Sequence, residues 1–269
     1  MATLIFCAFS NREDAVQLAH TVMEELSTRG HRGELCLLDA ADAPSVDADA
    51  LVISLGGDGT FLKAARIAHA AGAKILAVNL GRLGFLLDVP STEIVKSIDL
   101  ALAGTRLSDR LALAITIEGS GQDLFALNEV VVERSQAGHM VRVKTYVNDE
   151  EYLSYSADGV MVATPTGSTG YNFSAGGPVV DPALPVMMLT PIAPHFTIER
   201  SIVVDASATV RLVVIDKPAL LVADGRTIAS LAPGDGVQVR KSPSPVRVVA
   251  TRSFNMASRL RQSLREGHA

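Results

Sequence analysis

The chain has 269 residues, of which 48% are hydrophobic and 20% charged, and its formal net charge at pH 7 is −5. This length is enough for one large or two modest domains, each with its own core. The acidic balance argues against a protein that reads nucleic-acid sequence, because such proteins usually carry a basic surplus. The longest apolar runs fall short of the ~20 residues that a membrane span needs, and no secretory leader is evident. We therefore expect a cytoplasmic protein that binds neither nucleic acid nor membrane.

The first hundred residues alternate between strand and helix patterns. Strands are expected over residues 3–9, 34–38, 51–55 and 74–78, and helices over residues 13–29, 60–71 and 91–102. Asn11 is expected to cap the first helix and Gly30 to end it. The alternation predicts a parallel sheet with helices on its faces. Cys7 and Cys36 lie in the apolar strand runs, so we expect small buried hydrophobes there and no disulfide.

The pattern changes near Gly104 to short strands separated by Gly, Asn, Asp and Pro. These strands are expected over residues 110–118, 124–133, 141–148, 160–164, 201–204, 211–215 and 237–239. Residues 253–265 look helical again. The predicted fold class is thus an α/β N-terminal domain with a parallel sheet, followed by a β-rich C-terminal domain. We place the first domain at residues 1–103, with residues 250–269 returning to it, and the second at residues 104–249.

Three glycines and an acid, Gly56-Gly57-Asp58-Gly59-Thr60, follow the third strand and open a helix. Glycine is costly to order, so this turn needs either positive φ or a ligand close to the backbone. Backbone N–H groups at a helix N-terminus bind phosphate. Asp58 would repel an anion and instead suits a hydroxyl, or water on Mg²⁺, beside it. A tight turn capped by the aspartate is the alternative. Neither the P-loop nor the GxGxxG pattern is completed.

Two adjacent polar residues, Asn128 and Glu129, interrupt an otherwise apolar strand. Burying them without partners would cost roughly 1–3 kcal/mol per group, so we expect them to pair internally or to face a ligand. An amide beside a carboxylate suits the edge of an adenine and the hydroxyls of a ribose. A β-bulge with solvent-facing side chains is the alternative.

The segment from Thr164 to Pro178 is dense in hydroxyl groups and glycine. Such a segment makes a polar nest for phosphate or a base, and Tyr171 adds a face for stacking. Ser168 lies in no GxSxG elbow and no histidine completes a triad motif, which disfavours a serine hydrolase. A structured glycine loop without a ligand is the alternative. None of the six histidines pairs with another His or Cys at metal-ligand spacing, so no zinc site is predicted.

Together these motifs resemble the NAD kinase family, and the resemblance covers most of the chain. The matching segments are GGDGT at 56–60, NLGRLGF at 79–85, LNE at 127–129, DG at 158–159, PTGST at 165–169, SAGGP at 174–178 and TPIAPH at 190–195. The diglycine–acid motif alone is weak, since lipid kinases and 6-phosphofructokinases have related versions. Its combination with the Asn-Glu pair and the Thr-Gly-Ser-Thr loop is specific.

The resemblance implies that the γ-phosphoryl of ATP, or of polyphosphate in some members, passes to the 2′-hydroxyl of the adenosine ribose of NAD, giving NADP. Asp58 would orient that hydroxyl and take its proton. The family places its active site in the cleft between the two domains. Its members are oligomeric, so a homodimer or homotetramer is implied. Mg²⁺ or another divalent cation would be held mainly through the ATP phosphates, with no metal site built from protein residues.

The resemblance also implies binding roles for individual residues. Those expected to bind ATP or phosphate are Gly56, Gly57, Thr60 and Arg82. Those expected to bind the substrate NAD are Gly59, Phe85, Asn128, Glu129, Asp158, Ser168, Thr169, Tyr171 and Ser174. Asp158 is expected on the nicotinamide side. For Arg82, a solvated loop charge is an equal alternative.

The chain departs from the family pattern at two positions. Gly170 stands where the family usually has alanine, and Ala157 where it usually has glycine. Relative to alanine, Gly170 lacks one methyl group at the floor of the adenine pocket, which changes the free energy of adenine binding by ~1 kcal/mol. This leaves open a paralogous kinase acting on another adenine nucleotide or nucleoside. A non-catalytic dinucleotide-binding regulator is a further alternative, which the intact Asp58 disfavours, and a reductase using NAD would lack its GxGxxG fingerprint.

Overall fold

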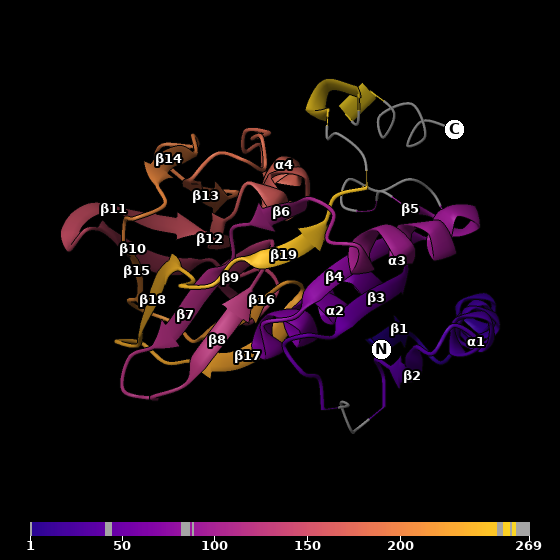
Figure 1. Cartoon of the computed structure of the whole chain (residues 1–269). Helices are drawn as coiled ribbons and strands as arrows, with labels where there is room; N and C mark the ends of the chain where they lie inside the picture. Colours follow the sequence, from indigo (N-terminus) through magenta and orange to yellow (C-terminus); the bar gives the residue numbers. More distant parts are fainter. Residues whose placement is uncertain are drawn as a thin grey trace. The chain divides into compact units, whose positions relative to one another are not determined.

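The computed structural model describes residues 2–40, 45–81, 87, 89–251, 255–258 and 260–261 (Figure 1). The chain divides into two compact units, unit 1 with residues 1–110 and 244–269, and unit 2 with residues 111–243. The sequence placed these boundaries at 103/104 and 249/250. They fall elsewhere in the structure because β6 (Leu107–Arg110) and β19 (Val246–Val249) pair with one another in the sheet of unit 1.

Unit 1 is built on a mainly parallel sheet with the order β2-β1-β3-β4-β19-β6, and β5 pairs additionally with β4. The remaining bounds are β1 (Thr3–Ala8), β2 (Arg32–Leu37), β3 (Leu51–Gly56), β4 (Lys74–Asn79) and β5 (Val89–Pro90). Within this sheet, only the β19–β6 pair is antiparallel among the described strands. The predicted α/β domain with a parallel sheet is therefore confirmed. Cys7 and Cys36 lie opposite one another on β1 and β2, both buried and free, as expected.

Helices cover both faces of this sheet. They are α1 (Glu13–Ser27), α2 (Asp58–Ala71) and α3 (Ile94–Leu102), the last preceded by a 3₁₀ turn, η1 (Ser91–Glu93). Apolar residues of α1 and α3 form one core with alternate residues of β1, β3 and β4, including Phe6, Ile53 and Leu76. The intervening strand residues point to the opposite face, and α2 lies against β1, β3, β4 and β19.

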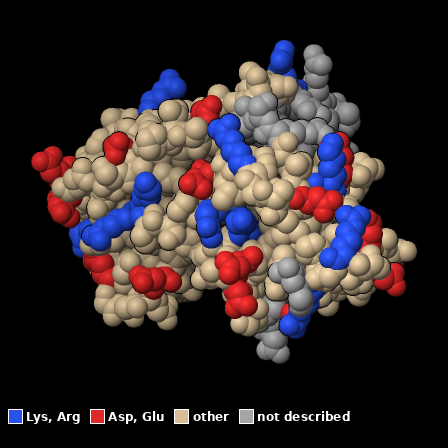
Figure 2. All heavy atoms as spheres, viewed as in Figure 1, with Lys and Arg blue, Asp and Glu red and all other residues tan. Residues whose placement is uncertain are grey.

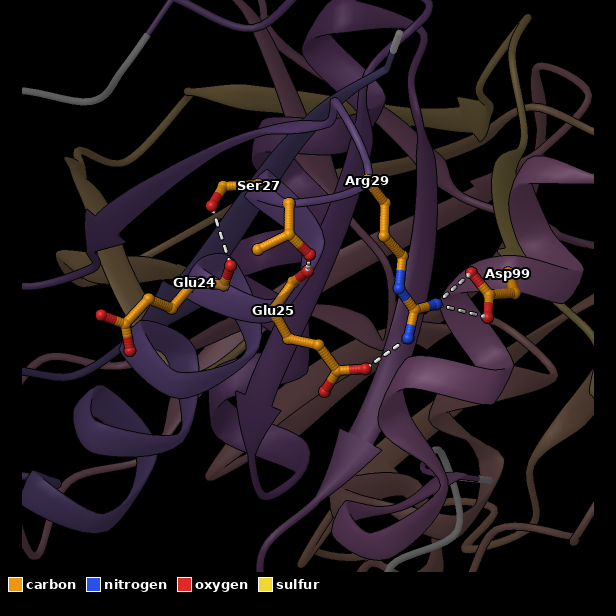
Figure 3. Close-up of polar contacts among 6 residues, drawn as sticks. Glu24, Glu25, Ser27, Arg29 and Asp99 are labelled. Carbon is orange, nitrogen blue, oxygen red and sulfur yellow. Dashed lines mark hydrogen bonds and ion pairs between the residues drawn. The ribbon is translucent and has the colours of Figure 1, made fainter.

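The ends of α1 differ from the expectation. Arg12 precedes the helix, and no side-chain hydrogen bond caps it among the described residues, so the prediction of Asn11 as its cap was wrong. The helix ends at Ser27, before Gly30, where the Ser27 hydroxyl donates to the Glu24 carbonyl. Figure 3 shows Arg29 reaching between Glu25 of α1 and Asp99 of α3, with Arg29 Nη1 3.2 Å from Asp99 Oδ2. This contact ties α1 to α3 at the surface.

Unit 2 is a sandwich of two antiparallel sheets within the described residues. One sheet has the order β11-β10-β15-β18-β7-β8 and the other β14-β13-β12-β9-β16-β17. The bounds are β7 (Leu113–Ile117), β8 (Asp123–Ala126), β9 (Glu129–Arg134), β10 (Val141–Val147), β11 (Glu150–Ala157), β12 (Gly159–Ala163), β13 (Val186–Ile192), β14 (Ile202–Asp205), β15 (Val210–Val214), β16 (Ala219–Ala223), β17 (Arg226–Leu231) and β18 (Gly236–Lys241), with short helical turns η2 (Thr166–Thr169) and α4 (Tyr171–Ser174). The inner faces of both sheets share one apolar core. The predicted β-rich domain is confirmed.

The single strand expected over residues 124–133 is two strands that belong to different sheets. β8 pairs with β7 in the first sheet, and β9 pairs with β12 and β16 in the second. The chain changes sheet at Leu127 and Asn128, so the polar residues that interrupt the apolar run mark this crossing. In unit 2 the strands β11, β13, β16 and β17 were not predicted, and in unit 1 the strands β5, β6 and β19 were not predicted either. Of the helix predicted over 253–265, residues 255–258 and 260–261 are described; 256–258 and 260–261 are helical and Asn255 is not, and the rest of the predicted range lies outside the described residues.

Charges of both signs are interspersed on the face shown in Figure 2, and no large area of one sign stands out there. None of the helices in the described part of the chain has both the length and the apolar character needed to cross a lipid bilayer.

Candidate active site

The glycine–aspartate turn joins the buried strand β3 to helix α2 in unit 1. Gly57 precedes the helix, Asp58 is its first residue, and the Phe61 N–H donates to the Gly57 carbonyl at 3.0 Å. A Cβ added at Gly56 would lie 2.3 Å from Thr60 Oγ1 and 2.9 Å from Thr60 Cβ. Gly56 is therefore required by packing, because the buried Thr60 side chain occupies that space.

Gly57 and Gly59 have no such internal reason to be glycine. A Cβ added at either position would meet no heavy atom within 4 Å among the described residues, and neither residue has positive φ. The space beside their backbone is open, at the end of the helix where N–H groups and the dipole favour an anion. Asp58 stands between them, half-buried. The turn can thus accept phosphate against its backbone while presenting one carboxylate.

The neighbouring strand β4 ends beside this turn. Gly56 and Asn79 are register partners, and the Leu80 N–H donates to the Gly56 carbonyl at 3.2 Å. The Asn79 side chain accepts a hydrogen bond from the Gly81 N–H at 3.0 Å, which begins a tight turn. Ligands of α/β sheets gather at such carboxyl ends of adjacent parallel strands. The expected site residues Arg82 and Phe85 lie outside the described residues.

In unit 2, polar groups gather where three adjacent inner strands of the second sheet begin or end. β9 begins at Glu129, its partner β12 ends at Ala163, and its other partner β16 ends at Ala223. The segments that extend from these three strand ends carry Asn128, the Thr164–Tyr171 loop and Asp224. The structure therefore brings together the Asn-Glu pair and the hydroxyl-rich loop, which are more than 30 residues apart in the sequence.

The Asn-Glu pair presents buried polar atoms that the chain does not satisfy. Asn128 Oδ1, Glu129 Oε2 and the nearby Thr166 Oγ1 are buried and have no hydrogen-bond partner among the described residues. Glu129 is 7% exposed. Burial, and secondly the charge of Asp224, raise the pKa of Glu129 to about 7. Unsatisfied buried acceptors are costly, so their clustering indicates a place for a ligand that donates hydrogen bonds.

The hydroxyl-rich loop is held tightly against Asn128. A Cβ added at Gly167 would lie 2.1 Å from the Asn128 carbonyl oxygen, so only glycine allows this approach. The Thr164 hydroxyl donates to the Leu127 carbonyl at 2.6 Å and accepts from the Gly167 N–H at 3.0 Å, while the Thr164 N–H donates to the Asn128 carbonyl. The loop and the Asn-Glu pair therefore form one unit of structure.

Some hydroxyl and amide groups of this loop serve the fold. The Ser168 hydroxyl is fully buried, donates to the Val180 carbonyl at 3.2 Å and accepts from the Val180 N–H at 3.0 Å. The buried Asn172 side chain likewise binds the Pro178 carbonyl and the Thr190 hydroxyl. These contacts make Ser168 a group that holds the loop. A direct contact between its hydroxyl and a ligand stays a prediction.

The remaining predicted residues lie on the accessible side of this loop. Thr169 and Gly170 are half-buried, Tyr171 is 41% exposed and Ser174 is exposed. Burial, and secondly the charges of Glu133, Asp158 and Glu129, raise the pKa of Tyr171. Asp158 itself pairs with Arg134, with Oδ1 and Nη1 3.1 Å apart.

Asp224 was missed by the sequence reasoning. Its carboxylate accepts hydrogen bonds from the backbone N–H groups of Leu127 and Asn128. The signal available in the sequence, Asp224-Gly225, reads as an ordinary hairpin turn. The Thr166 hydroxyl was missed as well, since the pattern did not distinguish it from its neighbours.

The two halves of the chain match two family models, the ATP-NAD kinase N-terminal domain over residues 9–105 and the ATP-NAD kinase C-terminal domain over residues 127–251. The NAD kinase of Citrifermentans bemidjiense is 38% identical over 253 residues, which cover 91% of this chain and 88% of that protein. This chain belongs to the NAD kinase family.

Other relatives agree with this assignment. The NAD kinase of Moorella thermoacetica is 39% identical over 221 residues, covering 80% of this chain and 71% of that protein. Among solved structures, an Archaeoglobus fulgidus NAD kinase in complex with ATP matches with a TM-score of 0.76 and 26% identity, covering 97% of this chain and 99% of that one. Yeast NADH kinase complexed with NADH matches with a TM-score of 0.81 and 24% identity, covering 100% of this chain and 89% of that one. The fold of this chain is therefore the two-domain NAD kinase fold.

Proposed function

We propose that this chain is an ATP-dependent NAD kinase in which Asp58 is the catalytic base. The observation that carries the proposal is the open backbone on either side of Asp58 at the start of α2, where Gly57 and Gly59 have no packing partner among the described residues. The family membership supports NAD as acceptor and ATP as donor, and the ATP complex of the Archaeoglobus fulgidus relative supports ATP further.

In the proposed reaction, the 2′-hydroxyl oxygen of the adenosine ribose forms a bond to the γ-phosphorus of ATP. The bond from that phosphorus to the β–γ bridging oxygen breaks, and ADP leaves with the electron pair. The proton of the 2′-hydroxyl goes to the Asp58 carboxylate. Phosphoryl transfer asks a protein mainly for positioning and charge neutralisation, and the N–H groups at Gly57, Gly59 and Thr60 supply part of both.

Asn128 and Glu129 are proposed to hold the adenosine half of NAD. Their buried, unsatisfied oxygens can accept hydrogen bonds from ribose hydroxyls or from the adenine amino group. Tyr171, exposed on the same loop that packs on Asn128, offers a face for stacking. Thr169, Ser174 and Asp158 remain proposed contacts of NAD, and Gly56, Arg82 and Phe85 remain proposed members of the site.

A divalent cation such as Mg²⁺ is also part of the proposal. No cluster of three or more His, Cys, Asp or Glu side chains able to hold a metal occurs among the described residues. We propose that the cation is held chiefly by the ATP phosphates, with Asp58 as the nearby carboxylate. When bound, the cation would neutralise the charge on the transferring phosphoryl group. Homodimeric or homotetrameric assembly and a cytoplasmic location stay predictions.

The test is an assay of NADP formation by the purified protein with NAD, ATP and Mg²⁺, run beside Asp58→Asn. General-base help is typically worth about 10²–10⁴-fold, so we expect kcat to fall by at least about 100-fold. Asp14→Asn is the matched control, since Asp14 also lies in the first turn of a helix of unit 1, and it should retain activity. Near-full turnover by Asp58→Asn would show that Asp58 is not the catalytic base. A well-folded wild type that makes no NADP would refute the proposed NAD kinase activity.

A second candidate, a kinase for another adenine nucleotide or nucleoside, rests on Gly170. A Cβ there would lie 3.5 Å from both Asn128 Nδ2 and Glu129 Oε2, so its absence widens the space beside the Asn-Glu pair. Screening other adenosine-bearing acceptors with labelled ATP tests this. A better acceptor than NAD would favour the second candidate.

A further inference from the structure

Asp224 occupies the first position of a two-residue hairpin loop between β16 and β17. Asp224 has φ +47° and Gly225 has φ +72°, which is the pattern of a type I′ turn. Such a turn accepts Asn or Gly at this position as readily as Asp. The turn alone therefore gives no reason for a carboxylate.

The carboxylate of Asp224 binds backbone far away in the sequence. Its Oδ1 accepts from the Asn128 N–H at 2.7 Å and its Oδ2 from the Leu127 N–H at 2.9 Å, and the Glu129 N–H lies 3.4 Å from Oδ1. The Asp224 N–H in turn donates to the Glu129 carbonyl at 3.0 Å. One side chain thus gathers the N–H groups at the point where the chain crosses from β8 to β9.

This crossing would otherwise leave its backbone poorly held. Leu127 and Asn128 lie between two strands of different sheets, so no strand pairing fixes their N–H groups. On the carbonyl side, Thr164 binds the oxygens of Leu127 and Asn128. Asp224 binds the N–H side with charge-assisted hydrogen bonds, which are roughly twice as strong as neutral ones. The backbone of the Asn-Glu pair is therefore clamped from both sides.

From this geometry we propose that Asp224 is a positioning residue for the dinucleotide, fixing the backbone of residues 127–129 so that the Asn128 and Glu129 side chains face the adenosine. The inference rests on the proposed function for the identity of the ligand. The contacts of Asp224 with the backbone of residues 127–129 are independent of the proposed function, because they are present in the protein without substrate. The backbone held in this way orients the buried oxygens of Asn128 and Glu129, which have no hydrogen-bond partner among the described residues, toward the ligand.

Two variants separate the clamp from the turn. Asp224→Gly keeps a residue suited to the type I′ turn and removes the carboxylate, whereas Asp224→Asn keeps an oxygen that can accept the contacts of Oδ1. The matched control is Asp149→Gly, in the two-residue loop between β10 and β11, where Asn148 and Asp149 also have positive φ. Asp149 is exposed and lies outside the proposed site.

We expect Asp224→Gly to raise the KM for NAD by about tenfold or more, the change that corresponds to losing about one strong hydrogen bond. The KM for ATP should stay within about twofold, Asp224→Asn should restore the KM for NAD to within about threefold of wild type, and Asp149→Gly should change neither constant. Equal changes in both KM values, or no change in Asp224→Gly, would overturn the proposal.

Amide hydrogen exchange of the free protein supplies a readout that needs no activity. In Asp224→Gly the N–H groups of Leu127 and Asn128 should exchange at least about tenfold faster, while those of Val160 and Val162 in the adjacent strand β12 keep their protection. Unchanged exchange at 127 and 128 would refute the clamp. If the wild type makes no NADP, the proposed function fails, yet this exchange result still decides whether Asp224 holds the backbone.

Discussion

The buried carboxyl of Glu129 should make the stability of the folded protein fall as the pH rises. Burial and the charge of Asp224 raise the pKa of Glu129 from its ordinary value of 4.5 to about 7. The folded state therefore binds this proton more tightly than the unfolded chain does. The contribution to stability is fully present below about pH 4.5 and is lost as the pH rises through about 7. Glu129→Gln replaces the group with a neutral amide of the same shape and removes this dependence.

The size of the effect follows from the two pKa values. A difference of one pKa unit between the folded and unfolded states corresponds to about 1.4 kcal/mol in the free energy of unfolding. Raising the pKa from 4.5 to about 7 therefore corresponds to about 3 kcal/mol. Above pH 7 the Glu129→Gln variant should be more stable than the wild type by up to this amount. Near pH 5 the two proteins should differ little.

Urea denaturation between about pH 5 and pH 8 measures this difference directly. Glu118→Gln is the contrasting variant, because Arg211 holds the pKa of Glu118 below its ordinary value. Stability from Glu118 is present above that ordinary value and lost as the pH falls, so its variant should lose stability near neutral pH. If Glu129→Gln gains no stability as the pH rises, the carboxylate of Glu129 is stabilised as an anion and the burial argument is refuted.

Three glycine substitutions test the site further. Gly167→Ala places a Cβ 2.1 Å from the Asn128 carbonyl oxygen. We expect the free energy of unfolding, measured by thermal denaturation, to fall by about 1–3 kcal/mol and most of the activity to be lost. An unchanged Tm would contradict this expectation. Gly59→Ala should stabilise α2 by up to about 1 kcal/mol yet reduce kcat, and full activity would mean that no ligand approaches this backbone. Gly170→Ala adds a methyl 3.5 Å from Glu129 Oε2, so stability should change by less than about 0.5 kcal/mol. Its KM for NAD should fall by up to about fourfold, and an increase would show that the added methyl obstructs the dinucleotide.

The sequence predicted β1 to β4 and α1 to α3 of unit 1 because their signals are local, whereas β5, β6 and β19 were not predicted. The apolar run Leu51–Leu55 became the buried strand β3, and its glycine–aspartate turn opens α2 as the pattern indicated. The sequence did not show why glycine is needed at each position of this turn. Gly56 is explained by the packing of Thr60, while a Cβ at Gly57 or Gly59 would meet none of the described atoms within 4 Å. This distinction depends on atoms that a sequence pattern does not place.

The second unit was harder to predict because its contacts are not local. The apolar run from Leu124 to Glu133 has one continuous β pattern, but its two halves pair with strands of different sheets. The choice of sheet is made by partners up to about a hundred residues away, among them Asp224. The Asn-Glu pair was nevertheless found from sequence, because two polar residues inside an apolar run need an explanation.

The placement of β19 between β4 and β6 has a consequence for how the chain is made. β6 has β19 as its partner in the sheet, and β19 follows the whole of unit 2 in the sequence. On the ribosome, domains generally fold in the order of their synthesis. Here the first unit to be started cannot be the first to be completed, since the edge of β4 at Lys74 and Ile75, where β19 pairs, stays uncovered until Val246–Val249 have been translated. The emerging chain must carry an unfinished parallel sheet through the synthesis of more than a hundred intervening residues, and the second unit is free to fold before the first.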